Sequence, residues 1–136
     1  MIVLCLLTGL IKAIRCGKGA VHDYKMFKKS GITIYKQSKI KADSGFQGIK
    51  DDFPNARTPH KATKLKSLTK EQKAENKVLA QERIPIEHIN RDCKIFKITQ
   101  QTYRGKHKNY HKTWLLVAAI VNLKKCTSHL KYARAA

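Results

Sequence analysis

The sequence predicts an α/β fold, in which a β-hairpin is followed by a short helix, a strand and long C-terminal helices. Two apolar runs rich in β-branched residues, MIVLCLL and LIKAIRC, flank Thr8-Gly9, a pair typical of a hairpin turn. Helix signals begin at Thr69, and the apolar run WLLVAAIVNL at 114–123 predicts the buried centre of a last helix. A chain of 136 residues is long enough for one domain with a modest core.

The segment after the hairpin predicts one short helix. Gly17 and Gly19 interrupt the second strand. Asp23 suits the N-cap position, because its carboxylate can accept a hydrogen bond from the first free amides of a helix. Gly31 marks the end of this helix, since glycine readily leaves the helical conformation.

A strand and a loop are expected next. KIKAD, residues 39–43, predicts a strand that stops at Asp43, because Ser44-Gly45 favours a turn. Residues 50–66 contain two prolines and mixed charge without periodicity, which predicts a loop. Asp43 therefore stands at the carboxyl end of a predicted strand, where sites form in α/β folds. The alternative interpretation is an aspartate that only starts the turn.

Two long helices should complete the chain. Thr69 and Gln72 form a capping-box pattern, so the first helix should run from about residue 70 into the nineties. Pro85 predicts a kink or a break within it. A last helix is expected over 108–127, with residues 128–136 as a frayed tail. One face of the first helix carries an apolar stripe: Leu79, Ile86, Ile89, Cys93 and Phe96.

The charge of the chain points to a polyanionic partner. Lys and Arg total 29 against 9 Asp and Glu, which gives a net charge of +20. Nucleic acid is the commonest partner of so basic a protein. The apolar runs do not predict membrane anchors: residues 1–11 lack a positive leader and a small-residue cleavage site, and 114–123 is shorter than the roughly 20 residues a span needs.

The cysteines and histidines give little sign of a metal or disulfide framework. The four cysteines form no CxxC pair, which suits a reducing cytoplasm. Cys126 and His129, or His107 and His111, have spacings that a zinc site can use. Because a tetrahedral zinc site needs four converging ligands, the favoured interpretation is solvated histidines and small buried cysteines.

Nine carboxylates are available for chemistry. Glu71, Glu75 and Glu82 are expected to be solvated helix-surface pairs with nearby cations. Glu87 differs, because Arg83 and Lys94 fall within about 40° of it on a helix. Two interpretations remain open for it: a surface ion pair, or a metal ligand beside cations that hold a polyanion.

ADSGFQG, followed by R-x3-E-x6-K at Arg83, Glu87 and Lys94, resembles the DDE transposases of bacterial insertion sequences, in particular the insertion-sequence-five family. That family's signature is Y-x2-R-x3-E-x6-K, and Ala80 stands where its tyrosine would be. GAVHDYKMFKKSG and TYRGKHKNYHKTWLLVAAIVNL resemble two further segments of the family. These matches cover roughly residues 8–123.

The resemblance implies a fold like ribonuclease H and a metal-dependent phosphoryl transfer on DNA ends. In such a site two Mg²⁺ (or Mn²⁺) ions about 4 Å apart activate the nucleophile and stabilise the leaving oxygen. By position, Asp43 would be the second catalytic aspartate and Glu87 the catalytic glutamate, both metal ligands. Arg83 and Lys94 would bind DNA phosphates beside the metal.

The same matching leaves the family's first catalytic aspartate without a counterpart. Upstream of Asp43 the one acidic residue is Asp23, which in the family occupies a helix-starting position and is not a ligand. We therefore expect an N-terminally truncated copy, the C-terminal part of a catalytic domain over residues 1–136. Such a copy would bind metal weakly and be inactive alone, or act as a homo-oligomer or with a complementing chain. The alternative is a basic nucleic-acid-binding protein without catalysis.

Overall fold

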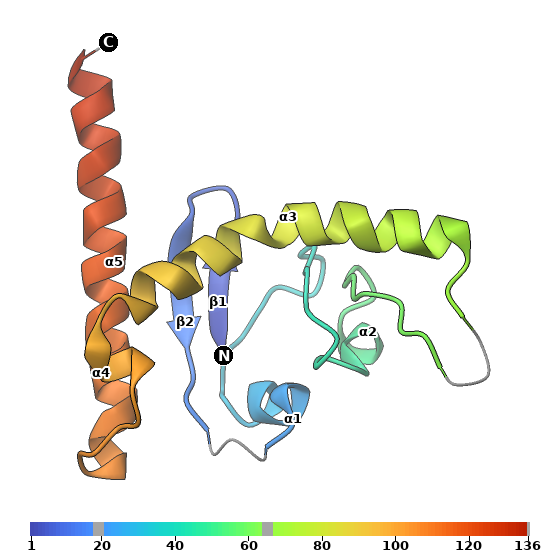
Figure 1. Ribbon diagram of the computed structural model, residues 1–136, viewed down its shortest axis with the longest axis horizontal. Helices are drawn as coiled ribbons and strands as arrows, with labels where there is room; N and C mark the ends of the chain where they lie inside the picture. The colour runs from blue at the N-terminus through green and yellow to red at the C-terminus, as the bar shows by residue number, and fades with distance from the viewer. Residues whose placement is uncertain (18–20, 64–66, 136) are drawn as a thin grey trace. The chain divides into compact units, whose positions relative to one another are not determined.

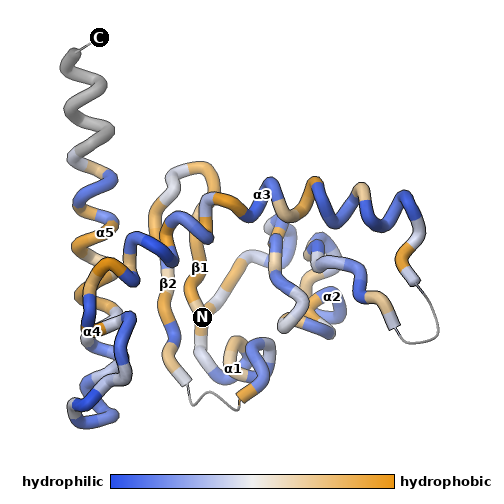
Figure 2. Tube along the Cα trace, viewed as in Figure 1, coloured by the Kyte–Doolittle hydropathy of each residue, from blue (hydrophilic) through white to orange (hydrophobic). Residues whose placement is uncertain are grey.

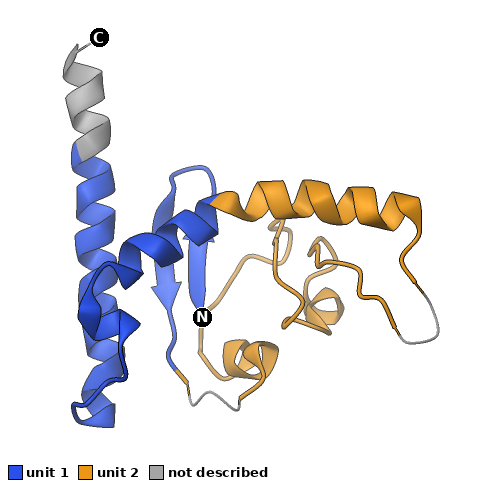
Figure 3. Cartoon of the chain, in the orientation of Figure 1, with its two compact units in different colours: residues 1–16, 85–136 blue, residues 17–84 orange. Residues whose placement is uncertain are grey.

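The computed structural model describes residues 1–17, 21–63 and 67–135, with the backbone alone for 128–135 (Figure 1). The chain divides into two compact units (Figure 3). Unit 1 comprises Met1–Cys16 and Pro85–Ala136, and unit 2 comprises Gly17–Ile84. Helices and strands occur together, as the sequence predicts, and the sheet of the described residues is a two-stranded antiparallel one.

The predicted hairpin is confirmed in unit 1. Strand β1, Ile2–Cys5, pairs antiparallel with β2, Leu10–Ile14, and the register shifts between Val3 and Leu4. Gly9 adopts φ +64° in the turn and donates its N–H to the carbonyl of Cys5 at 2.8 Å. This left-handed conformation favours glycine, so the turn depends on that residue.

Helix α5, His107–Ala135, packs its middle against β2. The Asn122 side chain fastens this contact: its Oδ1 accepts the N–H of Ile11 at 2.8 Å, and its Nδ2 donates to the Ile11 carbonyl at 2.9 Å. Figure 2 shows apolar residues along both strands and in the middle of α5. The core of unit 1 is one cluster of buried residues: Ile11, Ile14, Ile89, Cys93, Val117, Ala118 and Val121.

Unit 2 holds two short helices, α1 at Asp23–Lys28 and α2 at Ile49–Asp52. The first confirms the predicted short helix. Asp23 is its first helical residue, though, and His22 occupies the N-cap position without a side-chain hydrogen bond. The second helix lies at the start of the segment predicted as a loop. Buried apolar side chains hold the unit together: Tyr24, Phe27, Ala42, Ile49, Phe53, Ala56 and Leu79.

The predicted strand at residues 39–43 is wrong. Lys41 forms only an isolated parallel bridge with Arg57. Two hydrogen bonds make it, from the Ala42 N–H to the Arg57 carbonyl at 3.0 Å and from the Arg57 N–H to the Ile40 carbonyl at 2.8 Å. The chain turns immediately before Arg57, so Arg57 belongs to no extended segment that could pair with residues 39–43 as a strand.

Helix α3, Lys70–Lys94, begins at the predicted capping box. The Thr69 N–H donates to Gln72 Oε1 at 3.1 Å, and the Gln72 N–H donates to Thr69 Oγ1 at 3.2 Å. The helix is not broken at Pro85, contrary to one of the two expectations. Pro85 is exposed, so water can reach the backbone carbonyl that its missing N–H leaves free.

The C-terminal helices differ slightly from their predicted limits. A one-turn helix, α4 at Lys97–Gln100, follows α3 directly. Helix α5 continues to Ala135, so the end predicted near residue 127 lies inside the helix. Within the described residues, no helix is long and apolar enough to cross a membrane.

Candidate functional site

Asp43 is held by the turn that follows the isolated bridge of unit 2. Its Oδ1 accepts the N–H of Gly45 at 2.8 Å, and its backbone carbonyl accepts the N–H of Phe46 at 3.2 Å. The side chain is half-buried. The expected turn at Ser44-Gly45 therefore fixes the carboxylate of Asp43, and its second oxygen takes part in no hydrogen bond within the described residues.

A second carboxylate lies next to it. A Cβ atom placed on Gly45 would be 2.7 Å from Asp23 Oδ2 and 3.0 Å from Asp43 Oδ1, so both oxygens approach one point. A real Cβ essentially never lies 2.7 Å from another atom, so a side chain at position 45 would force the Asp23 carboxylate to move and would crowd that of Asp43. Neither carboxylate forms an ion pair within the described residues.

The pattern of residues around Asp23 does not predict that it belongs to the site. Asp23 and Asp43 are 20 residues apart, and the residues around Asp23 predict a helix start, where Asp23 indeed lies. The one sequence signal for the pair was the glycine directly after Asp43-Ser44. In the structure, the first turn of α1 brings Asp23 to that glycine.

The donor chemistry of this pair suits a hard divalent cation. Mg²⁺ prefers carboxylate oxygens, and it keeps several waters when a protein offers only a few of them. Two adjacent carboxylates repel one another, and a cation between them offsets that repulsion. Within the described residues no group of three or more Asp, Glu, His or Cys side chains converges, so the candidate centre has two carboxylates.

The other predicted site residues all lie on α3. Glu87 and Lys94 are exposed, and Arg83 is half-buried. In the described part of the chain Glu87 forms none of the ion pairs, so the surface ion-pair interpretation receives no support. Arg83 belongs to unit 2, as Asp43 does, whereas Glu87 and Lys94 belong to unit 1. The pairing of Asp43 with Glu87 stays a prediction.

Two of the carboxylates expected to be solvated are instead bound to distant residues of unit 2. Glu82 Oε1 lies 3.1 Å from Lys41 Nζ, and Glu82 Oε2 lies 3.6 Å from Arg57 Nη1. Glu75 Oε2 lies 2.7 Å from His60 Nε2. These contacts tie α3 to the segments before it, so both glutamates have structural roles.

Asp52 is also committed to the fold of unit 2. It accepts a short hydrogen bond from the Tyr24 hydroxyl and pairs with Lys28 Nζ at 3.0 Å. The hydrogen bond from Tyr24 is the main cause that lowers the pKa of Asp52, and Lys28 adds to it. Burial, together with the Asp52 carboxylate, raises the pKa of Tyr24. Asp52 is therefore not a free metal ligand.

A comparison with known families identifies the chain. Residues 1–122 match the model of the DDE superfamily endonucleases. The chain belongs to this family. DDE superfamily endonucleases depend on divalent metal ions, which agrees in kind with the oxygen donors beside Gly45.

One relative of the chain is a probable transposase for insertion sequence element IS702 from Microchaete diplosiphon. It is 41% identical over 115 residues, which make up 85% of this chain and 42% of the relative. The chain thus spans less than half the length of that protein. No solved structure is significantly similar to the chain.

Within the described residues, His107 and His111 belong to no group of three or more potential metal ligands. The side chain of His129 lies outside the described residues, whereas Cys126 and His107 are exposed. Cys93 is fully buried in the core of unit 1, and burial raises the pKa of its thiol.

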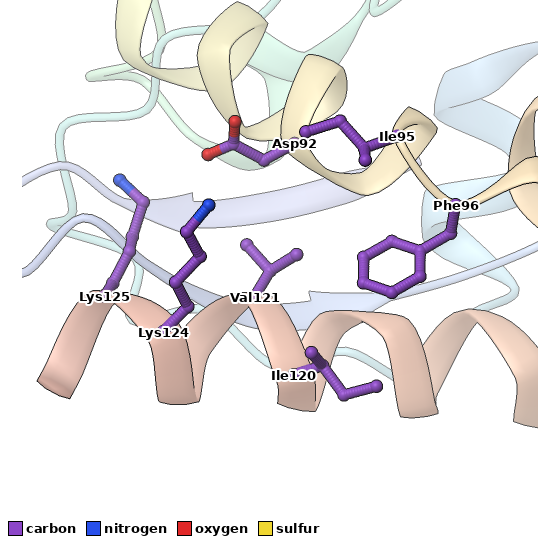
Figure 4. A pocket seen from close by; sticks show the side chains of 7 residues that line it. All are labelled: Asp92, Ile95, Phe96, Ile120, Val121, Lys124 and Lys125. Carbon is purple, nitrogen blue, oxygen red and sulfur yellow. The ribbon is translucent and has the colours of Figure 1, made fainter. Parts of the chain in front are cut away.

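A pocket of about 320 Å³ lies in unit 1 (Figure 4), and its lining residues are distant in sequence from Asp23 and Asp43. Its floor is apolar, and α5 contributes Lys124 and Lys125 while α3 contributes Asp92. A single carboxylate facing two ammonium groups is a poor site for a divalent cation. The pocket is therefore not the metal centre of the family.

Proposed function

We propose that this chain is part of a transposase of the insertion-sequence-five family, with a fold related to ribonuclease H, that cleaves DNA ends and joins them to target DNA. Membership of the DDE superfamily endonucleases supports this proposal. So does the 41% identity to a protein named as a probable insertion-sequence transposase. Because the chain covers 42% of that relative, the activity of the whole protein belongs to the proposal.

The observation that carries the proposal is the approach of Asp23 Oδ2 and Asp43 Oδ1 to one point beside Gly45. We assign Asp43 and Glu87 as ligands of Mg²⁺ or Mn²⁺, and Asp23 as a carboxylate that adds negative charge beside Asp43. The ion would supply Lewis-acid chemistry at the scissile phosphate. Because Gly45 has no Cβ, Asp23 Oδ2 and Asp43 Oδ1 can both lie close to its backbone, and its N–H holds Asp43.

The cations of α3 are assigned to DNA. Arg83 and Lys94 would bind phosphates beside the carboxylates, because cations placed near metal ligands neutralise a polyanion that approaches them. Their positions four residues before and seven residues after Glu87 place all three on one helical face. Both would orient the DNA backbone rather than read its sequence.

These 136 residues would bind the ion weakly and would not complete strand transfer alone. The family uses three carboxylates, and the proposal assigns two of them by position, Asp43 and Glu87. A further carboxylate would come from another polypeptide segment, in a homo-oligomer or in a complementing transposase chain. The action on DNA would take place in the bacterial cytoplasm.

Calorimetric titration with Mn²⁺ tests the proposal. The wild-type chain should bind Mn²⁺, Asp43→Asn should abolish that binding, and Glu87→Gln should weaken it. Asp51→Asn is the matched control, since it removes one exposed carboxylate of unit 2 that lies outside the candidate centre. A binding curve that Asp43→Asn leaves unchanged would overturn the assignment.

A second candidate function is nucleic-acid binding by charge alone. It is favoured by the absence of any aspartate or glutamate after Asp92 in the sequence. Binding of this kind weakens steeply with salt and is indifferent to Mg²⁺. A DNA affinity that Mg²⁺ leaves unchanged, together with no Mn²⁺ binding, would select this candidate over the first.

A further inference from the structure

Three aromatic side chains form a cluster between α4 and the first turns of α5. The ring centroids of Tyr103 and Tyr110 lie 4.9 Å apart, with 50° between the ring planes. Tyr110 and Trp114 follow at 6.5 Å, edge to face at 87°. We call Tyr103, Tyr110 and Trp114 the aromatic cluster. All three side chains are half-buried, so each keeps part of its surface open to solvent.

The aromatic cluster is held in place by its surroundings. The Tyr103 ring lies across the backbone of Gly105: a Cβ at Gly105 would be 2.6 Å from the Tyr103 hydroxyl oxygen and 2.7 Å from its Cζ. At the other end Trp114 packs against the buried core of unit 1. The Tyr110 ring contacts both the Tyr103 ring and the Trp114 ring. The rings therefore need little ordering before they meet a partner, which lowers the entropic cost of binding.

Two cations follow Tyr103 directly in the chain, on either side of Gly105. Arg104 and Lys106 are exposed, and within the residues that the structure describes neither of them forms an ion pair. The first turn of α5 contains no acidic residue. This surface combines rigid aromatic rings with positive charge that nearby side chains do not neutralise.

We propose that the aromatic cluster and these two cations bind an unpaired strand of DNA. Unpaired bases stack on aromatic side chains while the phosphates bind lysine and arginine, and both features are present here. The bases of a duplex are stacked on one another, so a duplex would contact the cations but could not stack its bases on the aromatic rings. The inference rests on the proposed action on DNA, and it adds a place where a separated strand is held.

Trp114 is the one tryptophan of the chain and so reports directly on this surface. The experiment titrates the full chain with a short thymidine oligonucleotide and with a blunt duplex of equal length, in EDTA, and follows tryptophan fluorescence. Stacking near Trp114 should quench the emission with the unpaired strand and much less with the duplex. Equal affinity for strand and duplex, or an unchanged emission spectrum at saturation, would overturn the inference.

A tyrosine variant tests the stacking. Tyr110→Leu keeps an apolar side chain in the aromatic cluster but removes a ring, and it should weaken strand binding about tenfold. Tyr35→Leu is the control, because Tyr35 is 69% exposed in unit 2 and forms no ring contact within the described residues. Equal losses in the two variants would count against the aromatic cluster.

The cations are tested without disturbing the core. Arg104→Gln and Lys106→Gln should each reduce the slope of log affinity against log salt by about 0.7, the value for one phosphate contact on a single strand. Lys73→Gln, at an exposed position on α3, should leave the slope unchanged. A slope that does not respond to either substitution would refute the proposed contacts even if Tyr110→Leu proved unstable.

The metal centre is separated from this surface by one further variant. Asp43→Asn should leave strand binding in EDTA intact, because the aromatic cluster uses no metal. Loss of Mn²⁺ binding with strand binding preserved supports both proposals. Mn²⁺ binding that Asp43→Asn does not affect would contradict the proposed function but not the present inference. If the chain bound an acidic peptide more tightly than the unpaired strand, the present inference would be contradicted but the proposed function would not.

Discussion

A methyl group on Gly45 would probe the proposed metal centre without removing a carboxylate. In Gly45→Ala the new Cβ would lie 2.7 Å from Asp23 Oδ2, 3.5 Å from Asp23 Cγ and 3.0 Å from Asp43 Oδ1. Asp43 is anchored by its hydrogen bond from the Gly45 N–H, whereas Asp23 is not. The Asp23 carboxylate should therefore rotate away, and the two oxygens would no longer share one point.

The expected change in folding stability is small. Gly45 is not among the glycines with positive φ, so alanine fits its backbone. Glycine to alanine at a compatible position stabilises by about 0.4–1 kcal/mol through the unfolded chain. Rotation of Asp23 off its preferred rotamer costs about 0.5–1.5 kcal/mol. The two effects offset one another, so the free energy of unfolding should stay within about 1 kcal/mol of the wild type.

The effect on metal binding should be larger, because the ion loses one of two adjacent carboxylates. We expect the Mn²⁺ affinity to fall at least tenfold, about 1.4 kcal/mol. Urea unfolding and Mn²⁺ calorimetry on the same preparation measure both quantities. Gly45→Ala with wild-type Mn²⁺ affinity would refute the reasoning.

Gly31→Ala provides the opposite control. Gly31 has φ +71° with nothing within 4 Å of an added Cβ, so alanine there is strained but meets no side chain. It should destabilise the chain by about 1–2 kcal/mol and leave Mn²⁺ binding unchanged. If both variants lost metal affinity in proportion to their stability, the loss would reflect unfolding and not the carboxylate pair.

Three further predictions concern the fold. Tyr24→Phe should raise the pKa of Asp52 toward its ordinary 3.8, as read from carboxyl NMR shifts. Since the folded pKa is lowered, the stability from Asp52 is present above that ordinary value and is lost as pH falls through the folded pKa, so the variant should lose less on acidification. Asn122→Ala should cost about 1–3 kcal/mol in urea unfolding, because it leaves the strand backbone unpaired, whereas the exposed Asn109→Ala should cost little. Ile89→Ala, at a fully buried site, should cost about 2–5 kcal/mol in the same assay; a cost near zero would contradict the core assignment.

Local patterns in the sequence predicted the elements that depend on neighbours in the chain. The hairpin turn at Gly9 and the capping box at Thr69 and Gln72 involve residues at most a few positions apart. Burial of Ile89 and Cys93 followed from helical periodicity. In each case the determining contacts lie within one helix or one turn, so the pattern contains the information.

The predictions failed where a distant segment decided the outcome. Residues 39–43 have a strand composition, but a strand needs a partner, and Arg57 supplies only one bridge. Glu82 has cations near it in sequence, yet it pairs with Lys41 and Arg57. A kink or a break was expected at Pro85, and the break does not occur: α3 is continuous, with buried Leu79 before the proline and buried Ile89 after it.

The sequence by itself determined the strong positive charge, the hairpin, the long helices and the resemblance that led to the DDE superfamily endonucleases. These properties follow from composition and from spacings of a few residues. The approach of Asp23 to Asp43, the hold of Asn122 on β2, and the aromatic cluster beside Gly105 came only from the tertiary structure. Each depends on side chains or segments meeting in space, and the energy of such contacts exists only once the chain has folded.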